Sequence, residues 1–253
     1  MKKTNGTYGV VFKGKNVTER YLRDNNGRLK ISNQEGLRTM QRKPGTIILL
    51  NGVGSAGKTS IATSLQAIFD APLLLMGMDL FIGSIAPRRY IADGDRATEG
   101  VAFVTIEGAD PPETALRTGP FGHVLMAGLH QTVATLATMG HNLVVDHVLW
   151  ERRWLDDCAV ALYDLPVLFV GVHCPLAVAE ARVYARADRP PILRGAVRWL
   201  FPRVHTDAIY DLEVETASAT AMECAEQIKR HLDAGLPMTA MRRLAQRAGV
   251  ERA

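Results

Sequence analysis

The sequence has few cysteines, few aromatic residues and no long apolar run. Its three cysteines, Cys158, Cys174 and Cys224, lack metal-ligand spacing, so we expect reduced, partly buried thiols in an intracellular protein and no metal site built from them. No apolar run reaches the length that crosses a bilayer, and the N-terminus lacks the apolar segment of a signal peptide. The sequence therefore predicts a cytoplasmic protein with no membrane partner.

The positive charge of the chain is concentrated at its N-terminus. Residues 1–43 contain 11 Lys and Arg and 3 Asp and Glu, a net charge of +8, whereas the remaining residues carry −4. A basic arm of this kind can bind nucleic acid. We favour the simpler interpretation of a poorly ordered, solvated N-terminal extension without a nucleic-acid partner. Met40, just before the first predicted core strand, is then expected to lie at or near the natural start.

From residue 44 onward, apolar runs of strand length alternate with helical spacings. This alternation predicts an α/β fold in which a parallel sheet lies between helices, a three-layer α/β/α sandwich. The predicted domain spans residues 44–235, and residues 236–253 form a C-terminal tail. Phe81–Pro112 is predicted to be irregular, with a hairpin near Val101–Glu107. The predicted strands are Ile47–Asn51, Pro72–Met76, Leu143–Asp146, Val167–Val172 and Leu212–Val214, and the predicted helices are Gly57–Phe69, Pro120–Met139, Arg152–Leu162, Pro175–Ala187 and Ala219–Leu232.

A glycine-rich loop joins the first predicted core strand to the first predicted helix. The segment Gly52–Thr59, GVGSAGKT, matches the phosphate-loop pattern G-x-x-x-x-G-K-[ST]. Its glycines let backbone N–H groups point at phosphate oxygens, and Lys58 can reach the β- and γ-phosphates of ATP while Thr59 binds Mg²⁺. A strand-to-helix turn with an incidental Lys and Thr is the alternative. The expected nucleotide contacts are Gly52, Gly54, Ser55, Ala56, Gly57, Lys58, Thr59 and Ser60.

Two aspartates follow other predicted strands, at the edge of the sheet where α/β folds bind ligands. Asp146 ends an apolar run, the Walker-B pattern, and is expected to hold Mg²⁺. Asp79 follows the second strand and is expected to act as the general base for an acceptor hydroxyl, with a helix N-cap as its alternative role. His147, beside Asp146, is interpreted as a packed or solvated histidine, and His173 ends the fourth strand at the same edge.

Three arginines follow the fourth predicted strand at helical spacing. Arg182, Arg186 and Arg189 lie on one helical face that runs into a pair of prolines. We expect residues 188–206 to form a lid over the nucleotide, in which Arg182 contacts the nucleotide and the other two arginines neutralise the transferred phosphoryl group. The alternative is a solvated basic helix end, stabilised by the helix dipole.

The order and content of these motifs resemble the chloramphenicol 3-O-phosphotransferase family, from about Ile47 to Leu232. The resemblance implies a P-loop kinase fold that moves the γ-phosphoryl group of ATP to a primary hydroxyl of the antibiotic. It also implies that Asp79 is the base and that Lys58 and Thr59 are the functional side chains of the phosphate loop. The matching segments are Ile48–Gly52, Gly57–Thr59, Gly77–Asp79, Val144–Val148, Phe169–Cys174, Ala179–Arg182, Ala185–Arg189, Val204–His205 and Tyr210–Val214.

The chain departs from this family at several points. His147 stands where the family has a second acidic residue, Phe81–Thr118 matches poorly, and the segments before residue 44 and after about Gly235 are additional. Residues 81–122 mix apolar and charged side chains, which suits an acceptor site or an ordinary surface patch. Because the expected acceptor site lies in this divergent region, the identity of the acceptor stays open.

Together, these features predict an ATP- and Mg²⁺-dependent phosphotransferase for a small hydroxylated acceptor, with antibiotic resistance as one role. Two alternatives stay open. One is a kinase of another metabolite, such as a nucleotide sugar, a shikimate-like compound or a cell-wall precursor. The other is a nucleotide-binding regulatory or nucleic-acid-associated module, which predicts slow ATP hydrolysis that no acceptor stimulates. The sequence does not indicate an oligomeric state.

Overall fold

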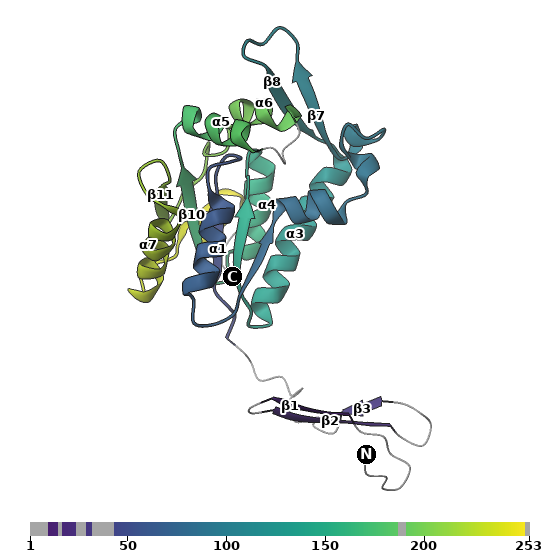
Figure 1. Cartoon of the computed structure of the whole chain (residues 1–253), viewed down its shortest axis with the longest axis vertical. Helices are drawn as coiled ribbons and strands as arrows, with labels where there is room; N and C mark the ends of the chain where they lie inside the picture. Colours follow the sequence, from purple (N-terminus) through teal and green to yellow (C-terminus); the bar gives the residue numbers. More distant parts are fainter. Residues whose placement is uncertain (1–9, 15–16, 24–28, 32–42, 187–190, 251–253) are drawn as a thin grey trace. The chain divides into compact units, whose positions relative to one another are not determined.

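The chain divides into two compact units, residues 1–42 and 43–253. The computed structural model describes residues 10–14, 17–23, 29–31, 43–186 and 191–250. In the first unit, the strands β1 (Val10–Gly14), β2 (Val17–Arg23) and β3 (Leu29–Ile31) form an antiparallel sheet (Figure 1). The expected poor order of this extension and the domain boundaries drawn from the sequence stay predictions.

Five parallel strands form the central sheet of the second unit, in the order β11-β10-β4-β9-β5. Each strand that was predicted from an apolar run is present, so the predicted parallel sheet is confirmed. No helix of the described residues is long and apolar enough to cross a membrane. The strands are β4 (Ile47–Asn51), β5 (Leu73–Gly77), β9 (Asn142–His147), β10 (Val167–His173) and β11 (Leu212–Glu215).

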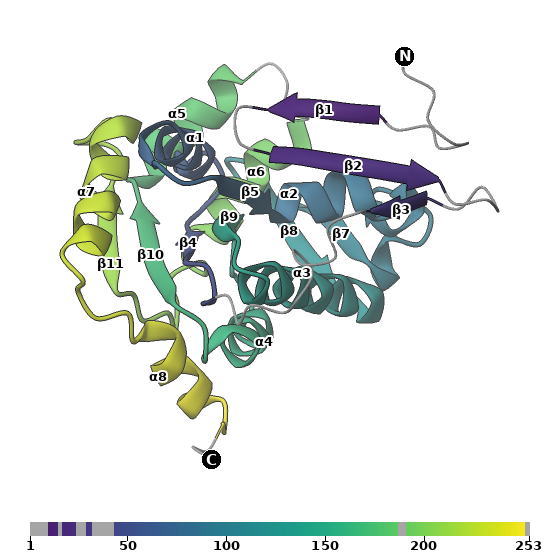
Figure 2. The same ribbon diagram turned by 90° about the horizontal axis from the view of Figure 1, so that it is seen from below.

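Helices cover both faces of this sheet, which confirms the three-layer α/β/α fold (Figure 2). On one face, α1 packs against α7; on the other, α4 packs against both α3 and α8. The connection after β10 forms α5, which packs against α6. These helices are α1 (Lys58–Ile68), α3 (Pro120–Thr138), α4 (Arg152–Leu162), α5 (Leu176–Ala185), α6 (Pro191–Leu200), α7 (Ala221–Asp233) and α8 (Ala240–Arg247).

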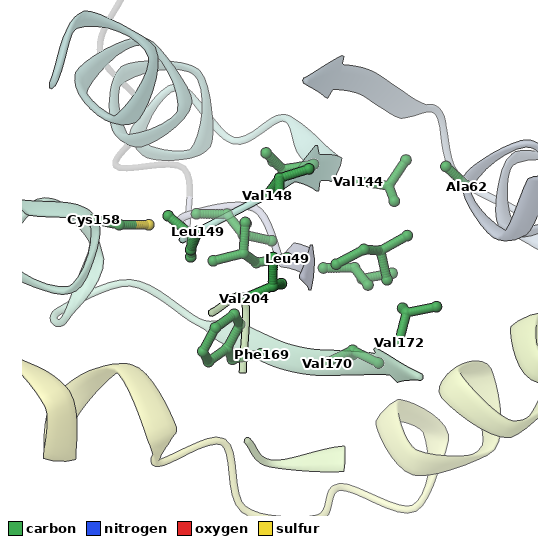
Figure 3. Packing of buried hydrophobic residues seen from close by; sticks show 14 of the residues in the cluster. Leu49, Ala62, Val144, Val148, Leu149, Cys158, Phe169, Val170, Val172 and Val204 are labelled. Atoms are coloured by element: carbon green, nitrogen blue, oxygen red, sulfur yellow. The ribbon is translucent and has the colours of Figure 1, made fainter. Parts of the chain in front are cut away.

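The central strand β4 is buried along its whole length. A strand that is buried on both faces has a continuous apolar run instead of an alternating pattern, which is why the sequence identified this strand. Leu49 of β4 belongs to the same buried cluster as Val144 of β9 and Phe169 of β10 (Figure 3). The glycine-rich loop that follows β4 is therefore anchored on a strand in the middle of the close-packed core.

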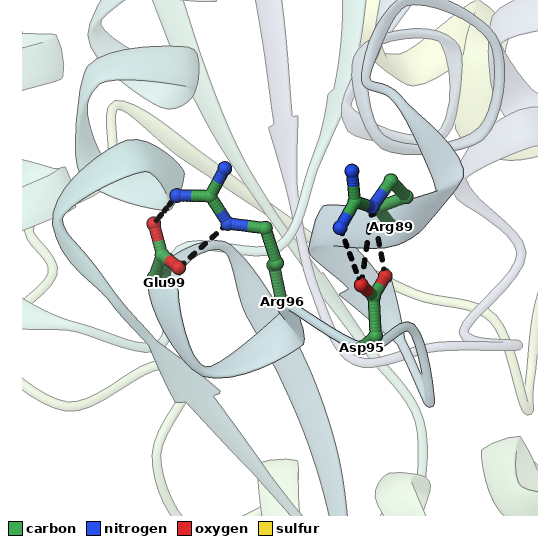
Figure 4. Close-up of polar contacts among 4 residues, drawn as sticks. All are labelled: Arg89, Asp95, Arg96 and Glu99. Atoms are coloured by element: carbon green, nitrogen blue, oxygen red, sulfur yellow. Dashed lines mark hydrogen bonds and ion pairs between the residues drawn. The ribbon is translucent and has the colours of Figure 1, made fainter.

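The connection between β5 and α3 is more regular than the sequence predicted. The prediction of irregular structure over Phe81–Pro112 is wrong in part, because turns of three to five residues are too short to show a helical period. The predicted hairpin is confirmed by β7 and β8, and the exposed ion pairs Arg89–Asp95 and Arg96–Glu99 lie nearby (Figure 4). The elements are α2 (Met78–Leu80), η2 (Phe81–Ile85), η3 (Arg88–Tyr90), β6 (Ile91–Ala92), η4 (Ala97–Glu99), β7 (Val101–Ile106) and β8 (Glu113–Thr118).

The segment predicted as a lid contains a helix, α6. Its first residue is a proline, which the first helical position tolerates because no N–H donor is needed there. The helix lies against β8, where an added Cβ on Gly195 would be 2.8 Å from Thr114 Oγ1. It also approaches the glycine-rich loop, because an added Cβ on Gly54 would be 3.7 Å from Val197 Cγ2. The helix α6 of the expected lid thus lies between the loop and the β7–β8 hairpin.

Candidate active site

The phosphate loop has the backbone geometry that its glycines permit. Gly57, at the N-cap of α1, has a φ of 101°, and Ser55 has a φ of 63°. A side chain at Gly57 would be strained in this left-handed conformation. Gly52 has a different role: it lets the loop backbone lie close to β10, since an added Cβ would be 2.4 Å from the carbonyl oxygen of Val172. The curled loop and the start of α1 together form a site suited to an anion.

Asp146, near the end of β9, contacts both functional side chains of the loop. Lys58 Nζ lies 3.4 Å from Asp146 Oδ1, and Thr59 Oγ1 donates a hydrogen bond of 2.5 Å to Asp146 Oδ2. Lys58 is only 5% exposed, and its ammonium also donates to the carbonyl oxygen of Val53 at 3.1 Å. The structure thus brings a cation, a hydroxyl and a carboxylate together at one point.

This set of donors suits Mg²⁺. The ion prefers oxygen ligands, and it is usually held by one or two carboxylates together with waters and the phosphates of a nucleotide. Thr59 and Asp146 supply a hydroxyl and a carboxylate within hydrogen-bond distance of each other. In the part of the chain that the structure describes, no group of three or more His, Cys, Asp or Glu could hold a metal. A metal at Thr59 and Asp146 would therefore need oxygens from a nucleotide or from water.

Asp79 lies at the same edge of the sheet as Asp146. Gly77, two residues earlier, ends β5 and is the register partner of Asp146. The two strands approach closely here, because an added Cβ on Gly77 would be 2.7 Å from the carbonyl oxygen of Asp146. Asp79 is exposed in the first turn of α2, and the N-cap of that helix is Gly77. The alternative role of Asp79 as an N-cap is therefore wrong, and its carboxylate remains a candidate base.

Arg182 on α5 braces the phosphate loop through Thr216. Its Nη1 donates to Thr216 Oγ1 at 2.9 Å, and its Nη2 donates to the Thr216 carbonyl oxygen at 2.7 Å. Thr216 Oγ1 in turn donates to the carbonyl oxygen of Ala56 in the loop at 2.7 Å. A contact of Arg182 with the nucleotide stays a prediction. Arg186 is the exposed C-cap of α5, and Arg189 lies outside the described residues.

Asn51 is a site residue that the sequence analysis missed. This fully buried residue ends β4, and its Nδ2 donates to the carbonyl oxygen of Val204 at 2.9 Å and to Tyr210 Oη at 2.8 Å. Its Oδ1 accepts from the backbone N–H of Leu149 at 2.8 Å. Asn51 therefore ties the strand before the loop to the segments that follow β9 and α6. A polar residue that ends an apolar run just before Gly52 was the only signal in the sequence.

Two histidines, His130 on α3 and His147 on β9, form a buried hydrogen bond. Their Nε2 atoms are 3.0 Å apart, and the residues are 2% and 0% exposed. The backbone N–H of Val148 donates to His147 Nδ1 at 2.8 Å. Burial lowers the pKa of His147 to about 3 and that of His130 well below its usual range, so both rings are neutral near pH 7. The interpretation of His147 as a packed histidine is confirmed.

An aromatic cluster continues from this histidine pair to the start of α4. The ring centroid of Trp154 lies 6.3 Å from that of His147 and 4.1 Å from that of Trp150. Trp154 Nε1 donates to His123 Nδ1 at 3.1 Å. Within the described residues, His130 Nδ1 and Trp150 Nε1 are buried and have no hydrogen-bond partner. A buried polar group without a partner costs roughly 1–3 kcal/mol, so both atoms are candidate contacts for a ligand.

His173 ends β10 at the predicted edge and contacts both β11 and the segment that follows α6. Its ring stacks on His205 with centroids 4.1 Å apart, and its Nε2 lies 2.8 Å from Glu213 Oε2. The pKa of His205 is lowered to about 4, first by burial and then by the neighbouring His173. This stacked pair therefore belongs to the polar contacts around Tyr210 and Asn51, since His205 Nδ1 lies 2.7 Å from Tyr210 Oη.

Known proteins resemble this chain in sequence over most of the second unit. Residues 45–233 match the family model described as chloramphenicol phosphotransferase-like protein. Among curated proteins, "Putative O-phosphotransferase Rv2636" of Mycobacterium tuberculosis (strain ATCC 25618 / H37Rv) is 29% identical over 214 residues. This match covers 80% of the present chain and 89% of that protein.

Solved kinase structures share the fold at low sequence identity. A sugar kinase from Janibacter sp. HTCC2649 superimposes with a TM-score of 0.51 and 17% identity, over 75% of this chain and 95% of that chain. The APS kinase CysC of Mycobacterium tuberculosis, in complex with AMPPNP and APS, gives a TM-score of 0.51 and 14% identity, over 76% of this chain and 99% of that chain. At these identities the likeness establishes the kinase fold alone.

Proposed function

This chain belongs to the chloramphenicol phosphotransferase-like family, and from that membership we propose that it transfers the γ-phosphoryl group of ATP to a hydroxyl of a small molecule. The family and the kinase fold identify a phosphotransferase of the kinase type. ATP as the donor, a small hydroxylated acceptor, a cytoplasmic location and a role in antibiotic resistance are our additions. The observation that carries the proposal is the convergence of Lys58 and Thr59 on Asp146.

The phosphate loop and its neighbours bind the nucleotide in this proposal. Backbone N–H groups at Gly52–Thr59 and the start of α1 receive phosphate oxygens. The buried ammonium of Lys58 is held by Val53 and Asp146 at the point where the β- and γ-phosphates would lie. Mg²⁺ bound through Thr59 and Asp146 would neutralise negative charge on the phosphates.

Asp79 acts on the acceptor in this proposal. Its carboxylate orients the acceptor hydroxyl and takes its proton while the acceptor oxygen bonds to the γ-phosphorus. The bond from that phosphorus to the oxygen of ADP breaks in the same in-line step, so ADP leaves with the electron pair of that bond. Support comes from the position of Asp79, two residues after the register partner of Asp146.

Arg186 and Arg189 neutralise the moving phosphoryl group in this proposal. Both follow the helix that carries Arg182, and they precede α6, which approaches the phosphate loop near Gly54. Guanidinium groups make paired hydrogen bonds to phosphoryl oxygens, and charge on those oxygens is spread most widely in the transition state.

The test is release of ADP with a panel of hydroxylated compounds, namely chloramphenicol, neutral sugars, shikimate, gluconate and APS. We expect at least one acceptor to stimulate ADP release, with a phosphate ester detected by ³¹P NMR. Lys58→Ala should lower this turnover by roughly a hundredfold to a thousandfold, while Lys229→Ala, on α7, serves as the matched control. Slow ATP hydrolysis that no compound stimulates would favour the regulatory module instead.

A further inference from the structure

The hydrogen bonds around His147 fix the tautomers of both buried histidines. Because the N–H of Val148 donates to His147 Nδ1, that nitrogen carries no proton, and the neutral ring carries its proton on Nε2. This proton points to His130 Nε2, 3.0 Å away. The neutral ring of His130 then carries its own proton on Nδ1. The chain of hydrogen bonds from Val148 through His147 therefore ends at the Nδ1–H of His130, a buried donor.

Trp150 provides a second buried donor of the same kind. Its indole Nε1–H can only donate, the residue is 6% exposed, and Nε1 has no hydrogen-bond partner within the described residues. Ring contacts through Trp154 connect Trp150 to His147 and so to His130. Two neutral N–H donors without partners therefore belong to one continuous aromatic cluster.

This cluster is adjacent to the element that carries the proposed base. His147 directly follows Asp146, and Trp150 lies in the connection from β9 to α4. The helical turn η2, which begins two residues after Asp79, packs against α3, the helix that carries His130. The donors and Asp79 therefore lie on neighbouring elements at the same end of the sheet.

The surroundings of the two donors favour a neutral ligand group. Met126, Leu129 and Val133 on α3 are buried, so an anion entering here would lose its hydration among apolar side chains. Two charged groups lie near this cluster: Glu151 Oε2 is 3.8 Å from His123 Nδ1, which accepts from Trp154, and the Lys58 ammonium acts on His147. Neutral oxygens, in a hydroxyl or a carbonyl, can accept from an imidazole or an indole without such a cost.

We propose that His130 Nδ1 and Trp150 Nε1 bind neutral oxygens of the acceptor and so select an uncharged hydroxyl- or carbonyl-bearing molecule over an anionic one. This inference rests on the proposed phosphotransferase function and names the acceptor class for it. A neutral oxygen can come from the acceptor or from a buried water, and the test separates these two sources. In this proposal the two donors bind the acceptor, whereas Asp79 contacts the hydroxyl that reacts.

The test compares His130→Gln and Trp150→Phe with the wild type, using the same neutral and anionic compounds. In His130→Gln, the glutamine can still accept from His147 near the position of the His130 Nε2, but it places no donor at the position of the His130 Nδ1. In Trp150→Phe, the phenylalanine keeps an aromatic ring and removes the N–H. The matched control is His231→Gln on α7, because His231 also has a buried ring nitrogen without a partner among the described residues, on the other face of the sheet.

We expect the acceptor of the wild-type protein to be uncharged. Its KM should rise roughly tenfold or more in both variants, because the acceptor oxygen would then be bound without its hydrogen-bond donor. The KM for ATP should stay within about twofold, and the melting temperature should not fall, since removal of an unpaired donor leaves no partner exposed. His231→Gln should leave both KM values unchanged.

Other outcomes overturn the inference. If both variants keep the acceptor KM of the wild type but melt at a lower temperature, the donors bind a buried water. If only shikimate, gluconate or APS is phosphorylated, the assigned acceptor class is wrong; in these two cases the proposed function stands, because phosphoryl transfer is still observed. If the wild type transfers phosphate to none of the compounds, the proposed function and this inference fail together.

Discussion

The hydroxyl oxygen of Thr59 lies 2.5 Å from a carboxylate oxygen of Asp146, although 87 positions separate the two residues. This contact joins the first turn of α1 to the end of β9. The parallel pairing of β4 with β9, in which Leu50 is the partner of Asp146, sets the approach of the two segments. A hydroxyl and a carboxylate at this distance can share one cation through their oxygens.

Asp146→Asn should weaken the binding of Mg²⁺ that we propose for this pair. Asparagine keeps the size of the side chain and an oxygen for Thr59, but it removes the negative charge. We expect the Mg²⁺ concentration for half-maximal turnover to rise about tenfold, because hard cations are held mainly by charged oxygens. Asp156→Asn, which breaks an ion pair with Arg152 on α4, is the matched control. An unchanged Mg²⁺ dependence in Asp146→Asn would place the metal elsewhere.

Asp79→Asn should lower turnover by roughly a hundredfold or more, the usual scale for a positioned general base. The KM for ATP should barely change, because in the proposed role the carboxylate contacts the acceptor and not the nucleotide. Steady-state kinetics with varied ATP and varied acceptor measure both quantities. Equal losses in ATP affinity and turnover would instead assign Asp79 to the metal.

Arg186→Ala and Arg189→Ala should each lower turnover by about tenfold to a thousandfold, equivalent to about 1.4 to 4 kcal/mol. The proposed contacts would strengthen in the transition state, so ATP affinity should change less than turnover. Lysine at either position should restore activity only partly, because it supplies charge without the paired donors of a guanidinium. Turnover at the level of the wild type in both alanine variants would identify a solvated basic helix end.

Stability should fall as the pH drops below about 6.5, because His147 is buried as a neutral ring. Its pKa is about 3 in the folded protein, lowered by burial, whereas an unfolded histidine titrates near 6.5. Between these values the unfolded chain binds more protons, so the free energy of unfolding decreases with decreasing pH and is fully retained above pH 6.5. Urea unfolding at pH 7.5 and pH 5.0 measures this loss.

His147→Gln should lose less stability between these two pH values than the wild type, by about 2 kcal/mol. His141→Gln, at an exposed position after α3, is the matched control and should lose as much stability as the wild type. If His147→Gln and the wild type show the same pH dependence, His147 is not buried as a neutral ring in solution.

Removal of residues 1–39 should leave turnover and thermal stability nearly unchanged. These residues lie in the first compact unit, and their sequence offers little apolar surface to bury. Differential scanning calorimetry of the shortened chain tests the prediction. A loss of several degrees in melting temperature would show that the extension packs on the second unit.

The candidate site could be predicted where its signals are local. The strand β4, the phosphate loop and the start of α1 follow one another in the chain, so a short window holds the whole pattern. Asp146 was found because it ends an apolar run and Asp79 because it closely follows one, and parallel strands end at one edge of the sheet. The helix α6 was missed because its flanking prolines and charges are typical of a loop, and its packing against β8 depends on a distant segment.

The sequence by itself determined the parallel sheet and the phosphate loop, because apolar runs and glycine spacing are properties of neighbouring residues. Only the tertiary structure decided which polar groups are partners. Asn51 is hydrogen-bonded to both Leu149 and Val204, and His147 is hydrogen-bonded to His130. In each case the partners belong to segments that are distant in the chain. Such contacts depend on strand register and on helix packing, and both are set by burial of the whole core and not by any short stretch of residues.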